Sequence, residues 1–433
     1  MSRIPASTDV AVIGAGAAGL ATAIFARRAD TGARVLLFDG ARKPGAKILV
    51  SGGGRCNVTN GVVSERDFWG GNPVIVRRVL KALPVAGTIA FFADLGVTLH
   101  EEPGGKLFPD SNRARDVLDA LVRGVTTAGA EIVAGTRVHD VRRDGTGFAV
   151  ETASGVLNAR AVVLTTGGRS LPRTGSDGAG YAIAERLGHT LVAQTPALAP
   201  LLLEPGTPHS IHAALSGVSI DAELSVWVDD ALGVRLRGSL LWTHFGISGP
   251  VALNASRHWA RATLEGRAAR LTLNLYPGEA FDRVDAEWVD ASATRPSATI
   301  RGALSARVPE AVAVAILDAL ALPRDRTLAT LTRDDRRRLV HAVTAWPLPV
   351  ADTRGYNYAE ATAGGVPLTE IDPATMESRV CRGLYFAGEI LDVDGRIGGF
   401  NFQWAWCTAA LAGRGVTLTT PQRPAPNTLR ART

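Results

Sequence analysis

Three glycines near the N-terminus, Gly14, Gly16 and Gly19, have the spacing that brings a backbone against a phosphate. They follow an apolar run and open a helical segment, and a second apolar run ends in Asp39. The first glycine permits a tight turn, the second admits a pyrophosphate, and the third lets helix and strand pack closely. The helix N-terminus favours the anion, and an acid at the position of Asp39 accepts from a ribose hydroxyl. This βαβ context predicts a dinucleotide site rather than an ordinary glycine-rich loop.

A second glycine-rich stretch begins at Ser51, where three glycines lead directly into Arg55, Cys56 and Asn57. Consecutive glycines give a backbone that can approach a flat ligand and aim its N–H groups at it. Arg55 adds a fixed cation, and Asn57 adds a group that both donates and accepts hydrogen bonds. A flexible turn is the plain alternative, but it does not need Arg-Cys-Asn after its glycines. We therefore expect this loop to contact a ligand.

The motif of Gly14, Gly16 and Gly19 fits either NAD or FAD, so the choice between these cofactors depends on the other glycine-rich segments. An NAD enzyme would need neither the loop at Ser51 nor the GGFNFQ segment at 398–403. A flavin ring needs such a polar cradle, so we expect FAD. No second G-x-G-x-x-G is visible, so NADH or NADPH is expected to dock only transiently beside the flavin.

Four separated motifs resemble one family. SGGGRCNVTN from Ser51, AVVLTTGG from Ala161, WTHFGISGP from Trp242 and DVDGRIGGFNFQWAW from Asp392 are similar to the BaiN/YhiN-like family of FAD-dependent flavoproteins. The family more often has Ala where Thr165 stands. The resemblance covers most of the chain and is vague between residues 278 and 347.

The resemblance implies where the last segment meets the cofactor. In such flavoproteins a strand end followed by an acid and a glycine pair holds the ribityl–pyrophosphate part and the flavin edge. Gly398 and Gly399 permit that close approach, and their N–H groups face a helix start. Asp392 and Asp394 are placed to accept from ribityl hydroxyls, and residues 400–402 are placed to flank the ring. The alternative is a glycine-rich helix entry over an apolar patch.

The resemblance also implies a reaction. Members of the family have been linked to bile-acid intermediates and to uridine in ribosomal RNA, where a ring C=C conjugated to a carbonyl receives a hydride and a proton. We expect the hydride from flavin N5 and the proton from His244 or a nearby acid, with Arg55 stabilising negative charge. Cys56 is a second candidate donor. The structural alternatives are a loop-holding histidine for His244 and a buried packing residue for Cys56.

Two rival functions remain open at this point. One is a flavoprotein oxidase of a small amine or hydroxy acid, which would reduce oxygen. The other is a flavin-bound, RNA-associated scaffold without turnover, which the basic charge permits. We rank the NAD(P)H-driven reductase first.

The expected site residues come from these motifs together. The catalytic candidates are His244, Arg55 and Cys56, and no metal ligands are predicted. The expected cofactor-binding residues are Gly14, Gly16, Ala17, Ala18, Gly19, Asp39, Gly40, Lys47, Ser51, Gly52, Gly53, Arg55, Cys56, Asn57, Val138, Thr166, Gly167, Gly168, Gly388, Glu389, Asp394, Gly398, Gly399, Phe400 and Asn401.

The elements around the motifs predict an α/β fold with a discontinuous Rossmann-like FAD-binding domain. Short alternating runs after residue 196 predict an inserted antiparallel, barrel-like β domain, and helical spacing in 278–346 predicts a small helical subdomain. Residues 74–93 are expected to form one helix. The predicted boundaries are 1–195 and 362–415 for the FAD domain, 196–277 and 347–361 for the β domain, 278–346 for the helices, and 416–433 for a disordered tail.

Composition limits the classes of function. With 433 residues, 46% of them apolar and 20% charged, the chain is expected to form a soluble protein of more than one domain. The three cysteines lack a C-x-x-C pair, which argues against a disulfide framework or structural zinc. No membrane segment is visible, so we expect a cytoplasmic protein. The net charge of +6 is most simply a solvated basic surface, while a small molecule, a nucleobase or RNA stays open as substrate or partner.

Overall fold

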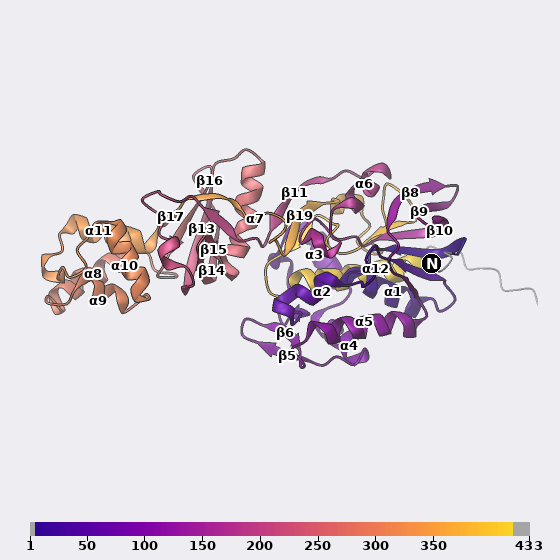
Figure 1. The fold of residues 1–433 in the computed structure, drawn as a ribbon, viewed down its shortest axis with the longest axis horizontal. Coiled ribbons are helices and arrows are strands. Elements are labelled where there is room, and N and C mark those ends of the chain that lie inside the picture. Colours follow the sequence, from indigo (N-terminus) through magenta and orange to yellow (C-terminus); the bar gives the residue numbers. More distant parts are fainter. Residues whose placement is uncertain (1–4, 419–433) are drawn as a thin grey trace, which may run out of the picture. The chain divides into compact units, whose positions relative to one another are not determined.

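The computed structural model describes residues 5–418 and divides the chain into two compact units. Unit 1 combines the chain up to Ala193 with the chain from Gly364 onward, and unit 2 consists of Gln194–Ala363 (Figure 1). The chain passes between them twice, in β11 (Val192–Ala197) and β19 (Ala361–Gly365), which pair with each other. The N-terminal fingerprint and the C-terminal glycine pair therefore belong to one unit.

Unit 1 is built on a mainly parallel sheet. Its strands are β1 (Ser7–Ile13), β2 (Val35–Phe38), β7 (Glu131–Val133), β8 (Val138–Asp144), β9 (Gly147–Thr152), β10 (Gly155–Leu164) and β20 (Leu384–Phe386). They run in the order β7-β2-β1-β10-β9-β8, with β20 also on β10. The pairs that involve β7, β2, β1 and β20 are parallel, whereas β8, β9 and β10 form an antiparallel meander. The predicted α/β fold class is confirmed.

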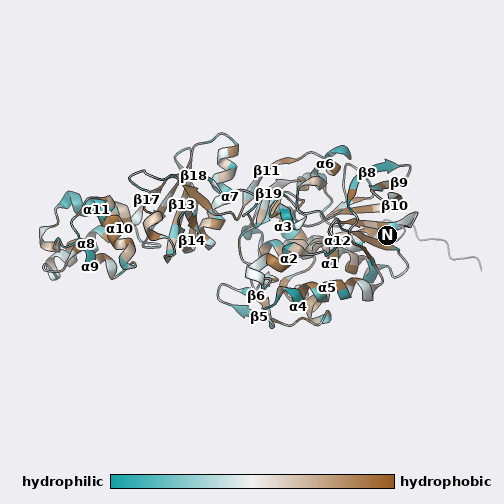
Figure 2. Cartoon of the chain, in the orientation of Figure 1, coloured by the Kyte–Doolittle hydropathy of each residue, from teal (hydrophilic) through white to brown (hydrophobic). Residues whose placement is uncertain are grey.

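The central strands are buried on both faces, as parallel strands under helices must be. All of β2 and β20 is buried, and the central strands of the sheet are largely apolar in Figure 2, whereas β8 and β9 at its edge are partly hydrophilic. Helix α1 (Ala17–Ala29) packs against α12 (Phe400–Leu418), so the two ends of the unit meet. Small residues allow this approach, because a Cβ on Gly413 would lie only 2.7 Å from Phe25 Cβ.

The described part of unit 1 also contains five α-helices and five short strands. They are helices α2 (Ala46–Val50), α3 (Pro73–Leu80), α4 (Val85–Asp94), α5 (Ala114–Ala128) and α6 (Ala179–Arg186), and strands β3 (Thr59–Asn60), β4 (Phe68–Gly70), β5 (Leu99–Glu102), β6 (Lys106–Pro109) and β21 (Val393–Gly395). The predicted single helix over 74–93 is wrong. Pro84 has no N–H to continue a helix, and it instead precedes the first turn of α4.

Unit 2 contains an antiparallel sheet. Its strands are β12 (Leu201–Leu203), β13 (Ser219–Val228), β14 (Ala231–Thr243), β15 (Gly246–Ser248), β16 (Ala269–Asn274), β17 (Trp346–Leu348) and β18 (Val350–Thr353). They run in the order β17-β16-β13-β14-β15-β12-β18. Only Pro349 separates β17 from β18, which stand at opposite edges of this order. The sheet must therefore curl until its edges come close, as in a barrel.

Helices complete unit 2. They are α7 (Pro250–Leu264), which packs on β13 and β14, and α8 (Phe281–Thr294), α9 (Ile300–Ser305), α10 (Glu310–Ala319) and α11 (Arg333–Thr344). Buried residues of α8 to α11 share one apolar core with the sheet, so these helices extend that core.

The end of the chain differs from the prediction in part. Residues 416–418 continue α12, so the predicted tail begins too early, and residues 419–433 lie outside the described part. Among residues 5–418, no helix is both long and apolar enough to cross a membrane.

A buried histidine fastens the segment after α6 to the returning chain. His189 Nδ1 lies 2.7 Å from Glu370 Oε2, and His189 Nε2 lies 2.8 Å from Ser378 Oγ. The Ser378 oxygen already accepts from the N–H groups of Val380 and Cys381, so its own proton is donated to Nε2. The His189 side chain is fully buried, and burial lowers its pKa below 6.5, although Glu370 opposes this shift.

Acidification should therefore destabilise unit 1 through His189. The unfolded histidine gains its proton near pH 6.5, whereas the folded one does so only at lower pH, so the free energy of unfolding falls as the pH drops below about 6.5. Urea unfolding at pH 8 to 5 should show a steep loss for the wild type and a flatter curve for His189→Gln. His139→Gln, at an exposed position on β8, should keep the wild-type slope. Equal slopes in all three proteins would contradict the assignment.

Candidate functional site

The fingerprint turn joins β1 to α1, and backbone contacts require two of its glycines. Gly14 has a φ of +104°, and a Cβ there would lie 2.6 Å from the Thr165 carbonyl oxygen. A Cβ on Gly19 would collide with the Gly14 carbonyl oxygen. A Cβ on Gly16, by contrast, would meet no protein atom within 4 Å. Gly14 and Gly19 thus close the turn, while Gly16 borders open space at the N-terminus of α1, where an anion is favoured.

Asp39 braces the fingerprint turn from the end of β2. Its Oδ2 accepts from the Ala15 N–H at 2.8 Å, and its Oδ1 accepts from the Ala41 N–H at 2.7 Å. A carboxylate can accept further bonds at both oxygens, so ribose hydroxyls can still be held. The Asp39 carbonyl accepts from the Thr136 N–H at 2.8 Å, which brings the start of β8, and with it Val138, toward the predicted adenosine end.

Thr165 explains the one departure from the family pattern. Its hydroxyl donates to the Gly14 carbonyl at 2.7 Å and to the Ile13 carbonyl at 2.9 Å. These bonds tie the end of β10 to the fingerprint turn, which an alanine could not do. Thr166, Gly167 and Gly168 follow directly, as predicted for the returning strand end.

Lys47 and Glu389, both predicted cofactor residues, form an ion pair between α2 and the segment after β20. Ser170 completes the cluster, because Lys47 Nζ donates to its hydroxyl at 2.5 Å and that hydroxyl donates to Glu389 at 2.6 Å. Three chain segments meet here at the carboxyl edge of the sheet. Sequence reasoning missed Ser170, since nothing marks it except its place two residues after Gly168.

The second glycine loop turns through the left-handed backbone region that glycine adopts without strain. Gly52 and Gly53 have φ values of +55° and +68°, and Cys56 also has a positive φ of +62°. Cys56 is fully buried, and burial raises the pKa of its thiol to about 12. Such a thiol gives up its proton poorly at neutral pH, which favours the packing alternative for Cys56. Its role as a donor stays a prediction.

Arg55 is held by the hairpin of β5 and β6. Its Nη1 donates to Glu102 Oε1 at 2.6 Å, and its guanidinium lies 4.1 Å from the centre of the Phe108 ring. The same bond lowers the pKa of Glu102. The side chain is still 41% exposed, so Arg55 is a fixed cation that remains open to an anionic group.

Segments more than 300 residues apart meet at the C-terminal glycine pair. A Cβ on Gly399 would lie 2.5 Å from the Thr59 backbone, and Asn60 Nδ2 donates to the Gly398 carbonyl at 3.1 Å. Asn57 Oδ1, buried beside Gly399, has no hydrogen-bond partner. A buried acceptor without a donor is costly unless a ligand supplies one. This orphaned acceptor and the open face at Gly16 fit FAD.

The remaining C-terminal residues are largely engaged within the protein. Asn401 holds the turn after β21, because its amide accepts from the Gly395 N–H at 2.8 Å and donates to the Gly395 carbonyl at 2.9 Å. Phe400 is buried against Phe68, with ring centres 6.1 Å apart. Asp394 is buried in β21, and the Gly388 N–H donates to Thr408 at 3.0 Å. Cofactor contacts from these residues stay predictions.

His244 lies in unit 2, in the turn between β14 and β15. Its side chain is exposed, and its ring meets that of Phe245 edge-on at 5.2 Å. Exposure is a condition that a proton donor must meet, so the catalytic alternative for His244 stays open.

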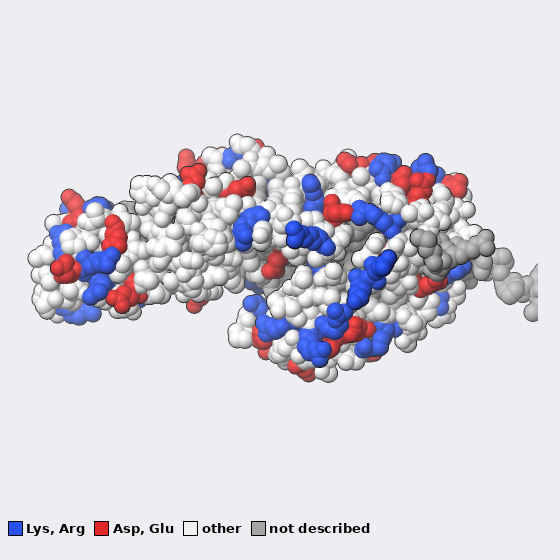
Figure 3. Space-filling view, viewed as in Figure 1, with Lys and Arg blue, Asp and Glu red and all other residues white. Residues whose placement is uncertain are grey.

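Three consecutive arginines, residues 336–338, form a basic run in α11, and acids pair with two of them. Arg336 pairs with Asp285 at 2.8 Å, Arg338 pairs with Asp335 at 3.1 Å, and Arg337 stacks on Phe281. Figure 3 shows red and blue side chains interleaved over these helices, whereas Lys and Arg form a row across unit 1. Paired arginines have little charge left for phosphates, so we interpret this run as a solvated helix face rather than a binding surface.

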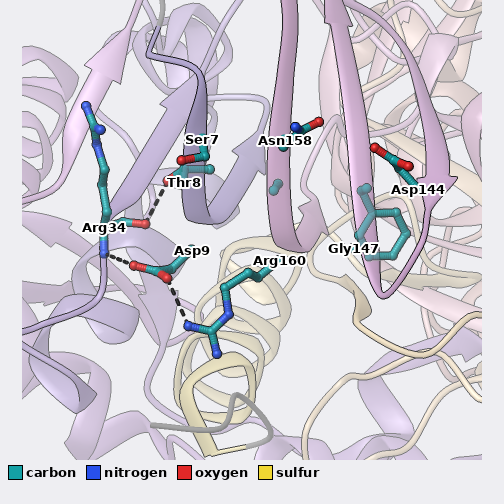
Figure 4. A pocket seen from close by; sticks show the side chains of 10 residues that line it. Ser7, Thr8, Asp9, Arg34, Asp144, Gly147, Asn158 and Arg160 are labelled. Atoms are coloured by element: carbon teal, nitrogen blue, oxygen red, sulfur yellow. Dashed lines mark hydrogen bonds and ion pairs between the residues drawn. The ribbon is translucent and has the colours of Figure 1, made fainter. Parts of the chain in front are cut away.

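A hollow also lies at the amino edge of the main sheet (Figure 4). It is lined by the start of β1 and the middle of β10, where Arg160 Nη1 pairs with Asp9 Oδ1 at 3.0 Å. The fingerprint turn lies at the opposite, carboxyl ends of these strands, so this hollow is not the dinucleotide site. Within the described residues, no group of three or more His, Cys, Asp or Glu is placed to hold a metal ion.

Comparisons with known proteins agree with this geometry. A family model described as the HI0933-like protein Rossmann domain matches residues 8–415. The chain is 33% identical to the 3-dehydro-bile acid delta(4,6)-reductase of Clostridium scindens, over 94% of this chain and 98% of that relative. It is 34% identical to the ribosomal RNA dihydrouridine synthase of Escherichia coli, over 93% and 96%. These matches confirm the resemblance inferred from the four motifs.

A solved structure shows the same fold. The quinol fumarate reductase subunit of E. coli superposes with a TM-score of 0.52 at 16% identity, over 97% of this chain and 72% of that one. Similarity at this level identifies the fold without indicating the substrate.

Replacing Gly16 by Ala should separate cofactor binding from folding. Gly16 has a φ of −80°, which alanine adopts without strain, and its added methyl meets no protein atom. We expect the apoprotein to unfold within about 0.5 kcal/mol of the wild type. FAD affinity, measured by flavin fluorescence, should fall about tenfold or more, because the methyl enters the pyrophosphate space.

Gly19→Ala provides the contrast. Its methyl collides with the Gly14 carbonyl, so urea unfolding of the apoprotein should show a clear loss of stability. Unchanged FAD affinity in Gly16→Ala would mean that the dinucleotide does not cross the fingerprint turn.

Proposed function

The chain belongs to the HI0933-like Rossmann family and is an FAD-dependent oxidoreductase, and we propose that it reduces a ring C=C bond conjugated to a carbonyl. The observation that carries this proposal is the near full-length match to two relatives whose names both describe such a reduction. A 4,6-unsaturated 3-oxo steroid and the uracil ring both present a C=C bond conjugated to a carbonyl. For this chain we propose the reaction that the two substrates share, and neither substrate in particular.

In this proposal, different residues of the chain bind the cofactor, stabilise charge on the substrate and donate the proton. Gly14, Gly16 and the N-terminus of α1 hold the pyrophosphate, and Asp39 holds the ribose. Bound FAD supplies hydride transfer, with NADH or NADPH as the transient electron source. Arg55, fixed by Glu102, stabilises negative charge that develops on the substrate carbonyl. His244 donates the proton.

Charge alone does not decide which substrate should be tried first. The net charge is +6, and the helical part of unit 2 uses its arginines in internal ion pairs. Arginines of unit 1 are paired in the same way, as Arg77 is with Glu65 and Arg137 with Asp177. If the substrate is RNA, the row of cations on unit 1 in Figure 3 is where its phosphates would be held. A uracil base within RNA and a free steroid are therefore tested side by side.

The purified holoprotein should lose its flavin absorbance when NADH or NADPH is added without oxygen. The reduced protein should then regain that absorbance when given uridine-containing ribosomal RNA or a 4,6-unsaturated 3-oxo bile acid, with one equivalent of reduced product. The substrate that works identifies the class.

Other outcomes would replace the proposal. Bleaching by a small amine or hydroxy acid, followed by rapid reoxidation by oxygen, would make the protein an oxidase. Salt-dependent RNA binding without turnover of any acceptor would make it a scaffold.

His244→Gln should lower turnover about a hundredfold or more, the usual range for loss of a general acid. Flavin bleaching by the nicotinamide donor should be unchanged, because that step needs no proton from His244. His209→Gln is the matched control, since His209 is also exposed in unit 2 and meets the Trp346 ring edge-on at 5.3 Å. Turnover that is equal in the two variants would remove His244 from the mechanism.

A further inference from the structure

Two hydroxyl groups near the end of β10 are buried without a hydrogen-bond partner. They are Thr166 Oγ1 and Ser176 Oγ. Ser176 is only 7% exposed, so bulk water does not solvate it. A buried hydroxyl without a partner costs free energy, so its retention needs an explanation.

Both groups lie against the backbone that forms the dinucleotide site. A Cβ on Gly167 would lie 2.8 Å from Ser176 Oγ, so this hydroxyl touches the strand-end glycine. A Cβ on Gly14 would lie 3.0 Å from Thr166 Cα, which places Thr166 beside the fingerprint turn. Gly180, in the first turn of α6, packs so closely on Thr166 that a Cβ there would collide with its hydroxyl. Ser176 and the first turn of α6 therefore belong to the wall of the site, whereas Thr174 has no such contact with it.

Other hydroxyls in the same region do have hydrogen-bond partners. Thr165 donates to main-chain carbonyls, Ser170 donates to Glu389, and Thr174 donates to the Leu171 carbonyl at 2.7 Å. Around the end of β10 the hydroxyls that fasten the fold are thus satisfied, and the two that touch the site have no partner. Elsewhere in the described residues, buried hydroxyls without a partner are also carried by Thr195, Thr243 and Ser305.

We propose that Ser176, together with Thr166, donates a hydrogen bond to the pyrophosphate of bound FAD. The pyrophosphate is the part of the ligand expected at the fingerprint turn, and its oxyanions are strong acceptors for a hydroxyl. Thr166 is already a predicted cofactor residue. Ser176 is the cofactor residue newly proposed here. Its sequence context, a glycine-rich turn, predicts only a turn before α6.

The test uses Ser176→Ala in the full chain, with the cofactor removed and then titrated back. FAD affinity should fall about tenfold, as for loss of a hydrogen bond to a charged group. Competition by ADP, which carries the pyrophosphate without the flavin, should weaken by the same factor, whereas riboflavin binding should not change. Thr166→Val should act in the same direction.

Apoprotein stability separates a ligand contact from a structural role. Removing an unpaired buried hydroxyl should leave the urea midpoint of Ser176→Ala equal to or above that of the wild type. Thr174→Val is the matched control, since it loses a hydroxyl paired within the protein and should lower stability while keeping FAD affinity. FAD and ADP affinities within twofold of the wild type in Ser176→Ala would overturn the proposal, as would a lowered midpoint with unchanged affinity.

The proposal rests on FAD binding and not on the reaction. Failure of the reductase assay would leave these affinities as they are. Absence of FAD binding in the wild type would overturn the cofactor assignment itself.

Discussion

Unit 1 depends on backbone lying against backbone at the carboxyl edge of its parallel sheet. Gly14 lies on the carbonyl of Thr165, Gly19 on Gly14, and Gly399 on Thr59. A Cβ at any of these glycines would occupy space that another main chain already fills. Each contact except the second joins distant parts of the chain, so the site exists only when β1, β10 and the returning C-terminal segment are all in place.

The polar groups around this edge fall into two sets. Asp39, Thr165 and the Lys47–Glu389 pair are used to hold strand ends and turns together. Asn57 Oδ1 and the Ser176 hydroxyl are buried and have no protein partner. In our proposal FAD supplies the missing partners of these two groups, and little reorganisation is needed on binding because the strand ends and turns are already fastened.

Charged side chains also differ in whether they are used within the protein or stay available at its surface. In the arginine run of α11, Arg336 is paired with Asp285 of α8 and Arg338 with Asp335 of α11, while Arg337 stacks on Phe281. Arg55 is also paired, yet it stays half exposed and fixed in direction by Glu102 and Phe108. A net charge therefore says little about where charge is available, because ion pairing is decided by which side chains the fold brings together.

The sequence by itself determined the dinucleotide turn, the second glycine loop, the inserted β and helical parts and the family, because each depends on local spacing or on a contiguous motif. It also contained the signal for the break at Pro84, a proline without an N–H, which the prediction of one helix over 74–93 passed over. It did not determine the place of Ser170 and Ser176 in the site wall. Those follow from contacts between segments that lie far apart in the chain. Whether a hydroxyl is satisfied depends on what packs against it, and only the tertiary structure decides that.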